Sequence, residues 1–171
     1  MTSFSQNDMD RLDWTLLQNG AISLDWQRSL FDRDVQWLED HKYVINLIDC
    51  SDIDGFRSRM TCVLRFKENY GYEPWGGNLD ALNDAFGDLD FDAAEGIAFC
   101  FTRIDLLAAG DPDLVQTVLD LIESHSSNYL LFGCRLLALV QSDDGKIRFD
   151  SVGARRVNWN CQERLNARRG L

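Results

Sequence analysis

The sequence has little proline and no long apolar run. Only two of the 171 residues are proline and 45% are hydrophobic, a composition typical of an ordered globular protein. No stretch approaches the roughly 18 continuous apolar residues of a membrane-spanning helix. The first residues, MTSFSQNDMDRLDW, are too polar for a secretory signal peptide. We therefore expect a protein of the cytoplasm with no membrane contact.

Basic residues are also scarce. Lys and Arg number 17 against 28 Asp and Glu, which gives a formal net charge of −11. This charge argues against direct binding of nucleic acid, which requires a basic surface, and favours a basic protein partner. The cysteines are odd in number and include no CxxC pair, so we expect free, mostly buried thiols and no zinc site. They are Cys50, Cys62, Cys100, Cys134 and Cys161.

Motifs of enzymes are missing as well. The sequence contains no Walker A, GxGxxG or HExxH pattern, and DIDG at 52–55 lacks the rest of a calcium loop. The two histidines, His41 and His125, lie at the polar ends of predicted helices, where contact with a helix C-terminus is the simplest role. A small cytosolic enzyme would need polar residues clustered around His125 or Cys134. We therefore expect no enzyme, no cofactor and no metal.

What the sequence does contain is an alternation of strands and helices. Apolar runs predict strands at 21–26, 43–50, 96–104 and 134–141, and helical periodicity predicts helices at 29–41, 53–64, 78–86 and 111–125. The run at 43–50 is so uniformly aliphatic that it predicts a strand covered on both faces. Strands separated by helices indicate an α/β fold with a small, mainly parallel sheet on which the helices pack. With no repeat or linker, residues 1–171 form one domain.

The C-terminal part changes in character. The segment SDDGK (142–146) predicts a hairpin turn, and IRFDSV (147–152) is then an antiparallel edge strand. The tail from Gly153 holds five arginines against one glutamate. We interpret this basic tail as a short amphipathic helix or a frayed end rather than as a surface for nucleic acid or an acidic partner.

One helix carries charges that its own stability does not explain. Asn78 is a good N-cap, and Leu79, Leu82 and Phe86 repeat at the spacing of one buried face. Asp80 suits the first turn, but Asp84 follows at i+4, where like charges repel by a few tenths of a kcal/mol. The pair therefore predicts a cation supplied by another molecule.

The stretch WGGNLDALND (75–84) resembles the motif of the barstar family, the intracellular inhibitors of barnase-type ribonucleases. YVIN (43–46), EGIAFCF (95–101) and GCRLLALV (133–140) resemble strands of the same family, so the resemblance covers residues 43–141. It implies a barstar-like core with additions at both ends. These are an N-terminal extension (1–42), with an extra strand and helix, and a C-terminal hairpin strand and basic tail (142–171).

The resemblance also implies a binding face. Asp80 and Asp84 match the aspartates that reach into the nuclease, Asn83 stands where the family has a tryptophan, and Glu123 lies near a further contact glutamate. Trp75 is as consistent with the core as with the interface. The whole implied partner-binding set is Trp75, Gly76, Gly77, Asn78, Leu79, Asp80, Asn83, Asp84 and Glu123.

The resemblance implies an immunity protein, monomeric before binding, that blocks a basic ribonuclease toxin. The alternative is a non-inhibitory scaffold or binding module for a basic protein partner. In both readings the partner is a protein that carries positive charge.

Overall fold

A computed structural model describes residues 4, 8–71, 75–92 and 94–171 of the chain. The elements in order are α1 (Leu12–Leu17), β1 (Ile22–Asp25), α2 (Arg28–Asp40), β2 (Tyr43–Asp49), α3 (Ile53–Val63), α4 (Phe66–Tyr70), α5 (Leu79–Gly87), β3 (Gly96–Thr102), α6 (Ile104–Gly110), α7 (Pro112–Leu130), β4 (Leu136–Gln141), β5 (Asn158–Trp159) and a 3-10 helix (Asn166–Arg169). The predicted helix starts are confirmed: the side chains of Asp52, Asn78 and Asp111 cap α3, α5 and α7.

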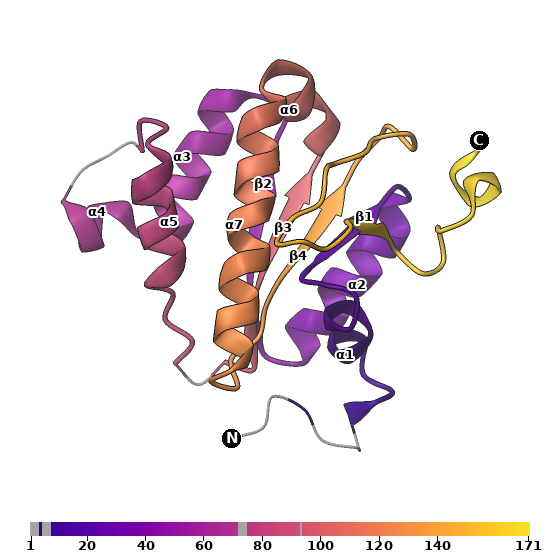
Figure 1. The fold of residues 1–171 in the computed structure, drawn as a ribbon, viewed down its shortest axis with the longest axis horizontal. Coiled ribbons are helices and arrows are strands. Elements are labelled where there is room, and N and C mark those ends of the chain that lie inside the picture. Colours follow the sequence, from indigo (N-terminus) through magenta and orange to yellow (C-terminus); the bar gives the residue numbers. More distant parts are fainter. Residues whose placement is uncertain (1–3, 5–7, 72–74, 93) are drawn as a thin grey trace.

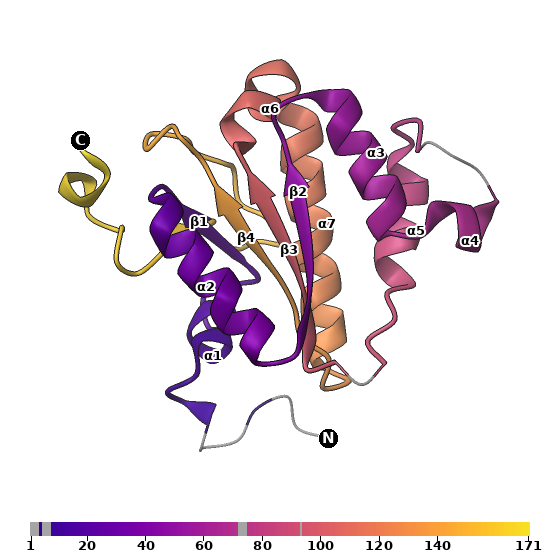
Figure 2. The same cartoon turned by 180° about the vertical axis from the view of Figure 1, so that it is seen from behind.

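The strands form one parallel sheet in the order β2-β3-β4-β1-β5. Helix α2 packs on one face of this sheet and α7 on the other (Figures 1 and 2). The central strands β3 and β4 are buried along their whole length, as their apolar sequences require. The predicted α/β fold with a parallel sheet and an additional N-terminal strand and helix is confirmed.

The prediction that 43–50 is covered on both faces is wrong. Strand β2 lies at the edge of the sheet, and Val44 and Leu47 remain 46% and 50% exposed. The prediction failed because a run of aliphatic residues does not show whether a strand lies in the centre or at the edge of a sheet, and an edge strand can leave some of its apolar side chains exposed. The cysteines need a similar correction: all five are free, but among them Cys50 and Cys100 alone are buried.

The predicted antiparallel edge strand at 147–152 is also wrong. Strand β4 has β3 on one side and β1 on the other, so it offers no free edge to a hairpin partner. The chain after β4 instead bonds to α6 and α7: Asp143 N donates to Asp105 Oδ1 (2.9 Å) and Gly153 N to Asp120 Oδ1 (2.8 Å). The edge strand opposite β2 is instead β5, two residues long and parallel to β1.

The basic tail is a docked segment, not an amphipathic helix or a frayed end. Glu163 is fully buried, and its carboxylate accepts the backbone N–H groups of Trp26 (2.7 Å) and Gln27 (2.8 Å) at the start of α2. Gln27, the N-cap residue, supplies no side-chain cap of its own. Asn160 Nδ2 donates to Asp25 (2.8 Å) on β1. The tail therefore completes both a helix and a strand of the extension.

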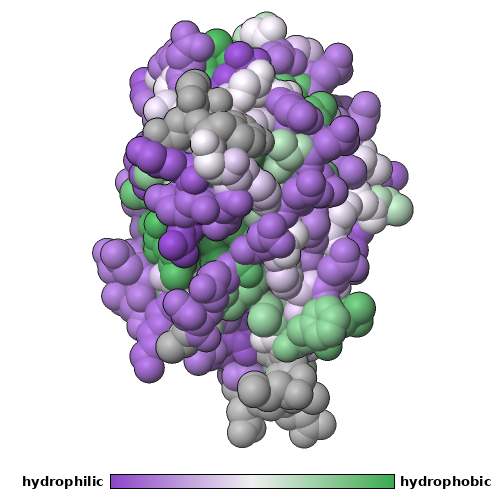
Figure 3. Space-filling model, turned by 90° about the vertical axis from the view of Figure 1, so that its left-hand side faces the viewer, coloured by the Kyte–Doolittle hydropathy of each residue, from purple (hydrophilic) through white to green (hydrophobic). Residues whose placement is uncertain are grey.

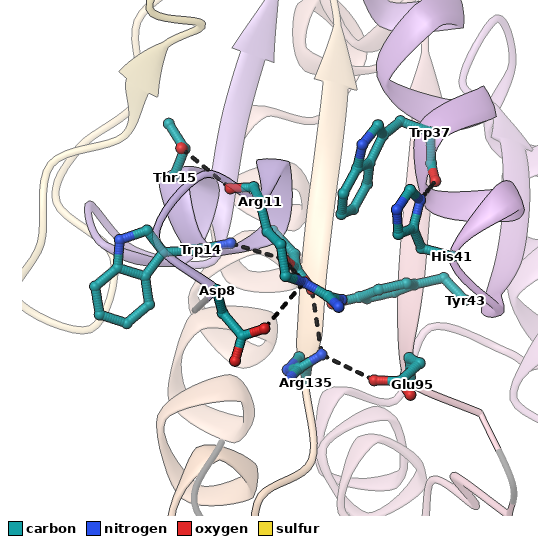
Figure 4. A network of polar contacts seen from close by, with 10 residues as sticks. Asp8, Arg11, Trp14, Thr15, Trp37, His41, Tyr43, Glu95 and Arg135 are labelled. Atoms are coloured by element: carbon teal, nitrogen blue, oxygen red, sulfur yellow. Dashed lines mark hydrogen bonds and ion pairs between the residues drawn. The ribbon is translucent and has the colours of Figure 1, made fainter. Parts of the chain in front are cut away.

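A buried polar network fixes α1 to the end of the sheet at which the strands β2, β3 and β4 begin (Figure 4). The Asp13 carboxylate accepts hydrogen bonds from Tyr43 Oη (2.6 Å) on β2 and from Arg11 Nη2 (2.8 Å), and it lies 3.3 Å from Arg135 Nη1. Burial opposes ionisation, but the bonds from Arg11 and Tyr43 hold the Asp13 pKa below its usual value. Arg135 also pairs with Glu95 (3.0 Å), which precedes β3.

Candidate partner-binding face

Helix α5 begins where its sequence says it should. Asn78 Oδ1 accepts the backbone N–H groups of Asp80 (3.0 Å) and Ala81 (3.4 Å), which satisfies two donors of the first turn. The predicted buried face needs one correction, because Leu79 is 40% exposed and Ala85 takes its place against the core. The buried residues of α5 are Leu82, Ala85 and Phe86.

The opposite flank of α5 presents carboxylates to solvent. Asp80 and Asp84 are both exposed, and within the described residues neither forms an ion pair with Lys, Arg or His. Asp88 caps the helix C-terminus and extends the i,i+4 series, accepting a hydrogen bond from Tyr70 Oη (2.9 Å). Asp88 was not predicted, although continuing the spacing of the first two aspartates would have indicated it.

Helix α7 holds α5 in place. Tyr129 Oη donates to the carbonyl oxygens of Phe86 (2.8 Å) and Gly87 (2.7 Å), which the end of the helix leaves without partners. It also accepts the N–H of Leu89 (3.2 Å). A three-way contact of this kind has no signal in the sequence near α5, because Tyr129 lies some forty positions away.

The two histidines differ in position. His41 caps α2, and its Nδ1 lies 2.7 Å from the carbonyl oxygen of Trp37, as predicted for a helix C-terminus. His125 lies inside α7 rather than at its end, and its Nε2 lies 2.9 Å from Asn83 Oδ1. Burial lowers the His125 pKa, although the contact with Asn83 opposes this shift. The side chain of Asn83 is therefore tied to α7.

The loop before α5 divides its residues between core and surface. Trp75 is 1% exposed, its Nε1 donates to the carbonyl oxygen of Asn78 (2.8 Å), and its backbone N–H donates to Thr61 Oγ1 (2.8 Å). Of the two roles left open for Trp75, the structure shows the core role. Gly76 is exposed and Gly77 half-buried. Pro74 lies outside the described residues.

Gly77 has φ +92°, a backbone conformation that favours glycine. A Cβ at this position would lie 3.2 Å from Nη2 of Arg57 on α3. Gly76 does not have a positive φ, and a Cβ there would meet no atom within 4 Å. Arg57 Nε is buried and has no hydrogen-bond partner within the described part of the chain. The guanidinium group of Arg57 therefore packs directly beneath Gly77 of this loop.

Glu123 does not belong to this surface. Its side chain is 2% exposed and lies on the inward side of α7, where Oε2 accepts the N–H of Ala21 (2.5 Å). Arg155 of the tail approaches Oε1 at 3.5 Å. Burial raises the Glu123 pKa, against the opposing effect of the Ala21 hydrogen bond. The assignment of Glu123 to the partner contact is therefore corrected: this residue joins β1, α7 and the tail.

Together, α5 and the described part of its loop present a negatively charged surface whose helix is fixed at both ends by hydrogen bonds. Figure 3 shows this side of the molecule, where hydrophilic residues surround a strip of apolar ones. Beside α5 a groove of about 390 Å³ is lined by apolar residues, by three aspartates and by further polar side chains, namely Asp88, Asp90, Asp92, Asn46, Asn69 and Arg65. In the described ranges, no group of three or more His, Cys, Asp or Glu side chains could hold a metal ion, and no helix is long and apolar enough to cross a membrane.

Comparison with protein families gives one match. The family model described as barstar, the barnase inhibitor, matches residues 33–141, from within α2 to the end of β4. Comparisons with the curated proteins and with the solved structures find no match. The matched region contains α5, its loop and the three strands β2, β3 and β4. Because it spans well over half of the sequence, the chain belongs to the barstar family.

Proposed function

We propose that this chain inhibits a ribonuclease by placing the carboxylates of α5 in the phosphate-binding part of the enzyme's active site. The observation that carries the proposal is the state of Asp80 and Asp84: both are exposed and without ion pairs among the described residues, on a helix whose start and end are fixed by hydrogen bonds. Membership of a family of ribonuclease inhibitors supports the same role.

The mechanism follows from the chemistry of the two surfaces. A ribonuclease active site is lined by Lys, Arg and His, which bind the phosphate groups of RNA. Two carboxylates on a rigid helix can accept charge-assisted hydrogen bonds from these cations and cover the cleft at the same time. Because Asp80 and Asp84 have no cationic partner to give up, binding requires no internal ion pair to be broken. The net charge of −11 attracts a basic enzyme over a longer range.

The biological role that fits this mechanism is immunity. We propose that the protein resides in the bacterial cytoplasm as a monomer and neutralises a basic nuclease toxin by forming a one-to-one complex. The N-terminal and C-terminal extensions are held on the fold by internal hydrogen bonds to Asp13 and Glu163. They lie outside the proposed contact surface, which consists of Gly76, Gly77, Asn78, Leu79, Asp80, Asn83 and Asp84.

One observation favours a second candidate, a binding module for a basic protein that is not a nuclease. The family places a tryptophan immediately before the second aspartate, whereas this chain has Asn83, which contacts His125. With Trp75 in the core, the face loses two aromatic side chains of the kind that anchor tight interfaces. A scaffold would leave the partner's active site open.

The experiment is a capture assay with a defined outcome. The purified chain is immobilised and mixed with a basic ribonuclease of the barnase type, and RNA cleavage by the captured enzyme is measured. Inhibition requires a stoichiometric complex without RNA cleavage. A complex that cuts RNA at the free rate would reject the inhibitor and favour the scaffold. Absence of any complex would reject both for that partner.

A further inference from the structure

The charge of the chain is divided unevenly between its parts. Residues 145–171 contain seven of the 17 Lys and Arg and two of the 28 Asp and Glu, so this segment carries +5 while residues 1–144 carry −16. Both ribbon views place the C-terminal segment on the side of the molecule opposite α5 (Figures 1 and 2). A basic surface therefore exists that the proposed nuclease complex does not cover.

This segment supplies all lining residues but Leu24 of a hollow of about 400 Å³, a volume within the usual range for small-molecule sites. The lining includes Arg148 and Arg156, the aromatic side chains of Phe149 and Trp159, and Leu24 at the carboxyl end of β1. Both aromatic residues are partly buried, so part of each ring is fixed by the core and part is accessible. The hollow thus combines positive charge with flat apolar surface.

The two arginines at the rim have no partner of their own. The side chains of Arg148 and Arg156 are exposed, and across the described residues neither forms a hydrogen bond or an ion pair. Arg169 differs, because it is buried, donates to the carbonyl oxygens of Gly145 (2.9 Å) and Glu163, and lies 4.5 Å from the Trp159 ring centroid. Arg169 therefore positions Trp159, which leaves Arg148 and Arg156 to meet a ligand.

The position of the hollow in the sheet also favours a ligand. Strands β1 and β4 are parallel neighbours, yet β1 leads into α2 on one face and β4 leads into a loop that bonds to α6 and α7 on the other. The loop after β4 and the edge strand β5 enclose the hollow beside Leu24, near the carboxyl end of β1, the end of the strands at which open α/β sheets bind ligands. The register pair Leu24 and Trp159 lies at this end.

We propose that this hollow binds a nucleoside phosphate, with Arg148 and Arg156 on the phosphate and the ring surfaces of Phe149 and Trp159 against the base. Arg binds phosphate through paired N–H donors, and aromatic rings stack on any base. The acidic remainder of the chain does not prevent this, because salt limits the reach of exposed charges to about 8 Å at physiological ionic strength. Asp150, also in the lining, disfavours additional phosphates close to it. The site is separate from the nuclease-blocking face and does not depend on it.

The phosphate can come from a free nucleotide or from the end of an RNA chain. Calorimetric titration of the full-length chain with AMP, GMP, inorganic phosphate and a short RNA with or without a 5′-phosphate distinguishes these sources. We expect a nucleoside monophosphate to bind at least tenfold more tightly than inorganic phosphate. Tighter binding of the 5′-phosphorylated RNA than of AMP and GMP would identify an RNA end as the source, and the reverse order a free nucleotide. If no nucleotide or RNA binds at millimolar concentration, or inorganic phosphate binds equally well, the proposal is wrong.

Two double variants provide the matched comparison. Arg148→Gln/Arg156→Gln should raise the dissociation constant at least tenfold. Arg164→Gln/Arg168→Gln removes the same charge from the same segment outside the hollow and should change it less than twofold. Both pairs are exposed, so thermal unfolding should match the unsubstituted chain. If nucleotide affinity falls equally in the two double variants, binding arises from general charge attraction, and the assigned site is wrong.

Discussion

At the scale of single residues, the account rests on Asp84. Among the described residues its carboxylate forms no ion pair, whereas Asp80 also stabilises the first turn of α5. We expect Asp84→Ala to weaken binding of the ribonuclease by about 2–5 kcal/mol, because truncating one member of a desolvated charge pair leaves the other unpaired. Folding stability should hardly change. Isothermal titration and thermal unfolding measure the two effects separately.

The matched control for Asp84 is Asp10→Ala, which removes the same charge from an exposed position in the N-terminal extension. It should leave affinity within about 0.5 kcal/mol of the unsubstituted value, as surface changes usually do. The loss of affinity in Asp80→Ala should lie between the losses in Asp84→Ala and Asp10→Ala, and the free energy of unfolding should fall slightly. Equal affinities for the Asp80/Asp84 double variant and the unsubstituted chain would remove α5 from the interface.

Asp25 makes stability depend on pH. It is fully buried, Asn160 donates to its Oδ1, and its Oδ2 has no hydrogen-bond partner among the described residues. Burial raises its pKa to about 8; Asp34 and Glu163 add to the shift, while the Asn160 hydrogen bond and Arg33 oppose it. The folded state thus favours the protonated acid, and this contribution to stability is lost as pH rises towards and through about 8.

We therefore expect the free energy of unfolding to fall between pH 6 and pH 9, and to fall less in Asp25→Asn, which stays neutral. Urea denaturation of both proteins at the two pH values measures the difference. The same pH dependence in both proteins would assign the titration to another group.

At the scale of elements, the loop before α5 sets where this helix points. Gly77→Ala should cost roughly 1 kcal/mol or more, because a side chain at φ +92° is strained and its Cβ would crowd Arg57. Gly76→Ala is the control, since its Cβ would meet nothing within 4 Å and its φ is not positive. Chemical denaturation compares the two. A larger loss for Gly76→Ala would show that the loop has another conformation.

The backbone N–H groups at the start of helix α2 are bound by the carboxylate of Glu163, near the C-terminal end of the sequence. Removing it in Glu163→Ala leaves the half-buried N–H groups of Trp26 and Gln27 without this acceptor. Hydrogen bonds to charged groups contribute about 1.5–3 kcal/mol each. Because water can partly replace the acceptor at half-buried donors, we expect a loss below the sum of two such bonds, about 2–4 kcal/mol, in urea denaturation. Gln162→Ala, at an exposed neighbour, should be nearly neutral. A neutral Glu163→Ala would mean that the tail is not a structural part of the fold.

Elements with local signals could be predicted from the sequence, and the others could not. The caps Asp52, Asn78 and Asp111 give helix starts because each acts within three residues of itself. Strand β5 has no such signal: it is two residues long and exists because β1 offers a free edge. The hairpin prediction was wrong for a related reason: an Asp-Gly turn specifies a hairpin only where the preceding strand lacks a neighbour, and β4 has β3 and β1 on its two sides.

At the scale of the whole molecule, the family core positions one surface and the extensions create another. The paired aspartates of α5 were predictable because they share one helix, four residues apart. The burial of Trp75 and Glu123 was not predictable, because it depends on Thr61 and Ala21, which lie on distant parts of the chain. The basic hollow likewise depends on how the tail returns to β1. Long-range packing, rather than local pattern, therefore decides which polar residues are available for binding.

Competition with RNA shows whether the chain blocks the active site of its partner ribonuclease. Initial rates of RNA cleavage by the partner ribonuclease are measured over a range of substrate concentrations, with increasing amounts of this protein. We predict that the apparent KM rises while kcat is unchanged, because the α5 carboxylates and the RNA phosphates occupy the same cations. A ternary complex in which RNA is still cut, seen as residual activity at saturating inhibitor, would contradict the account.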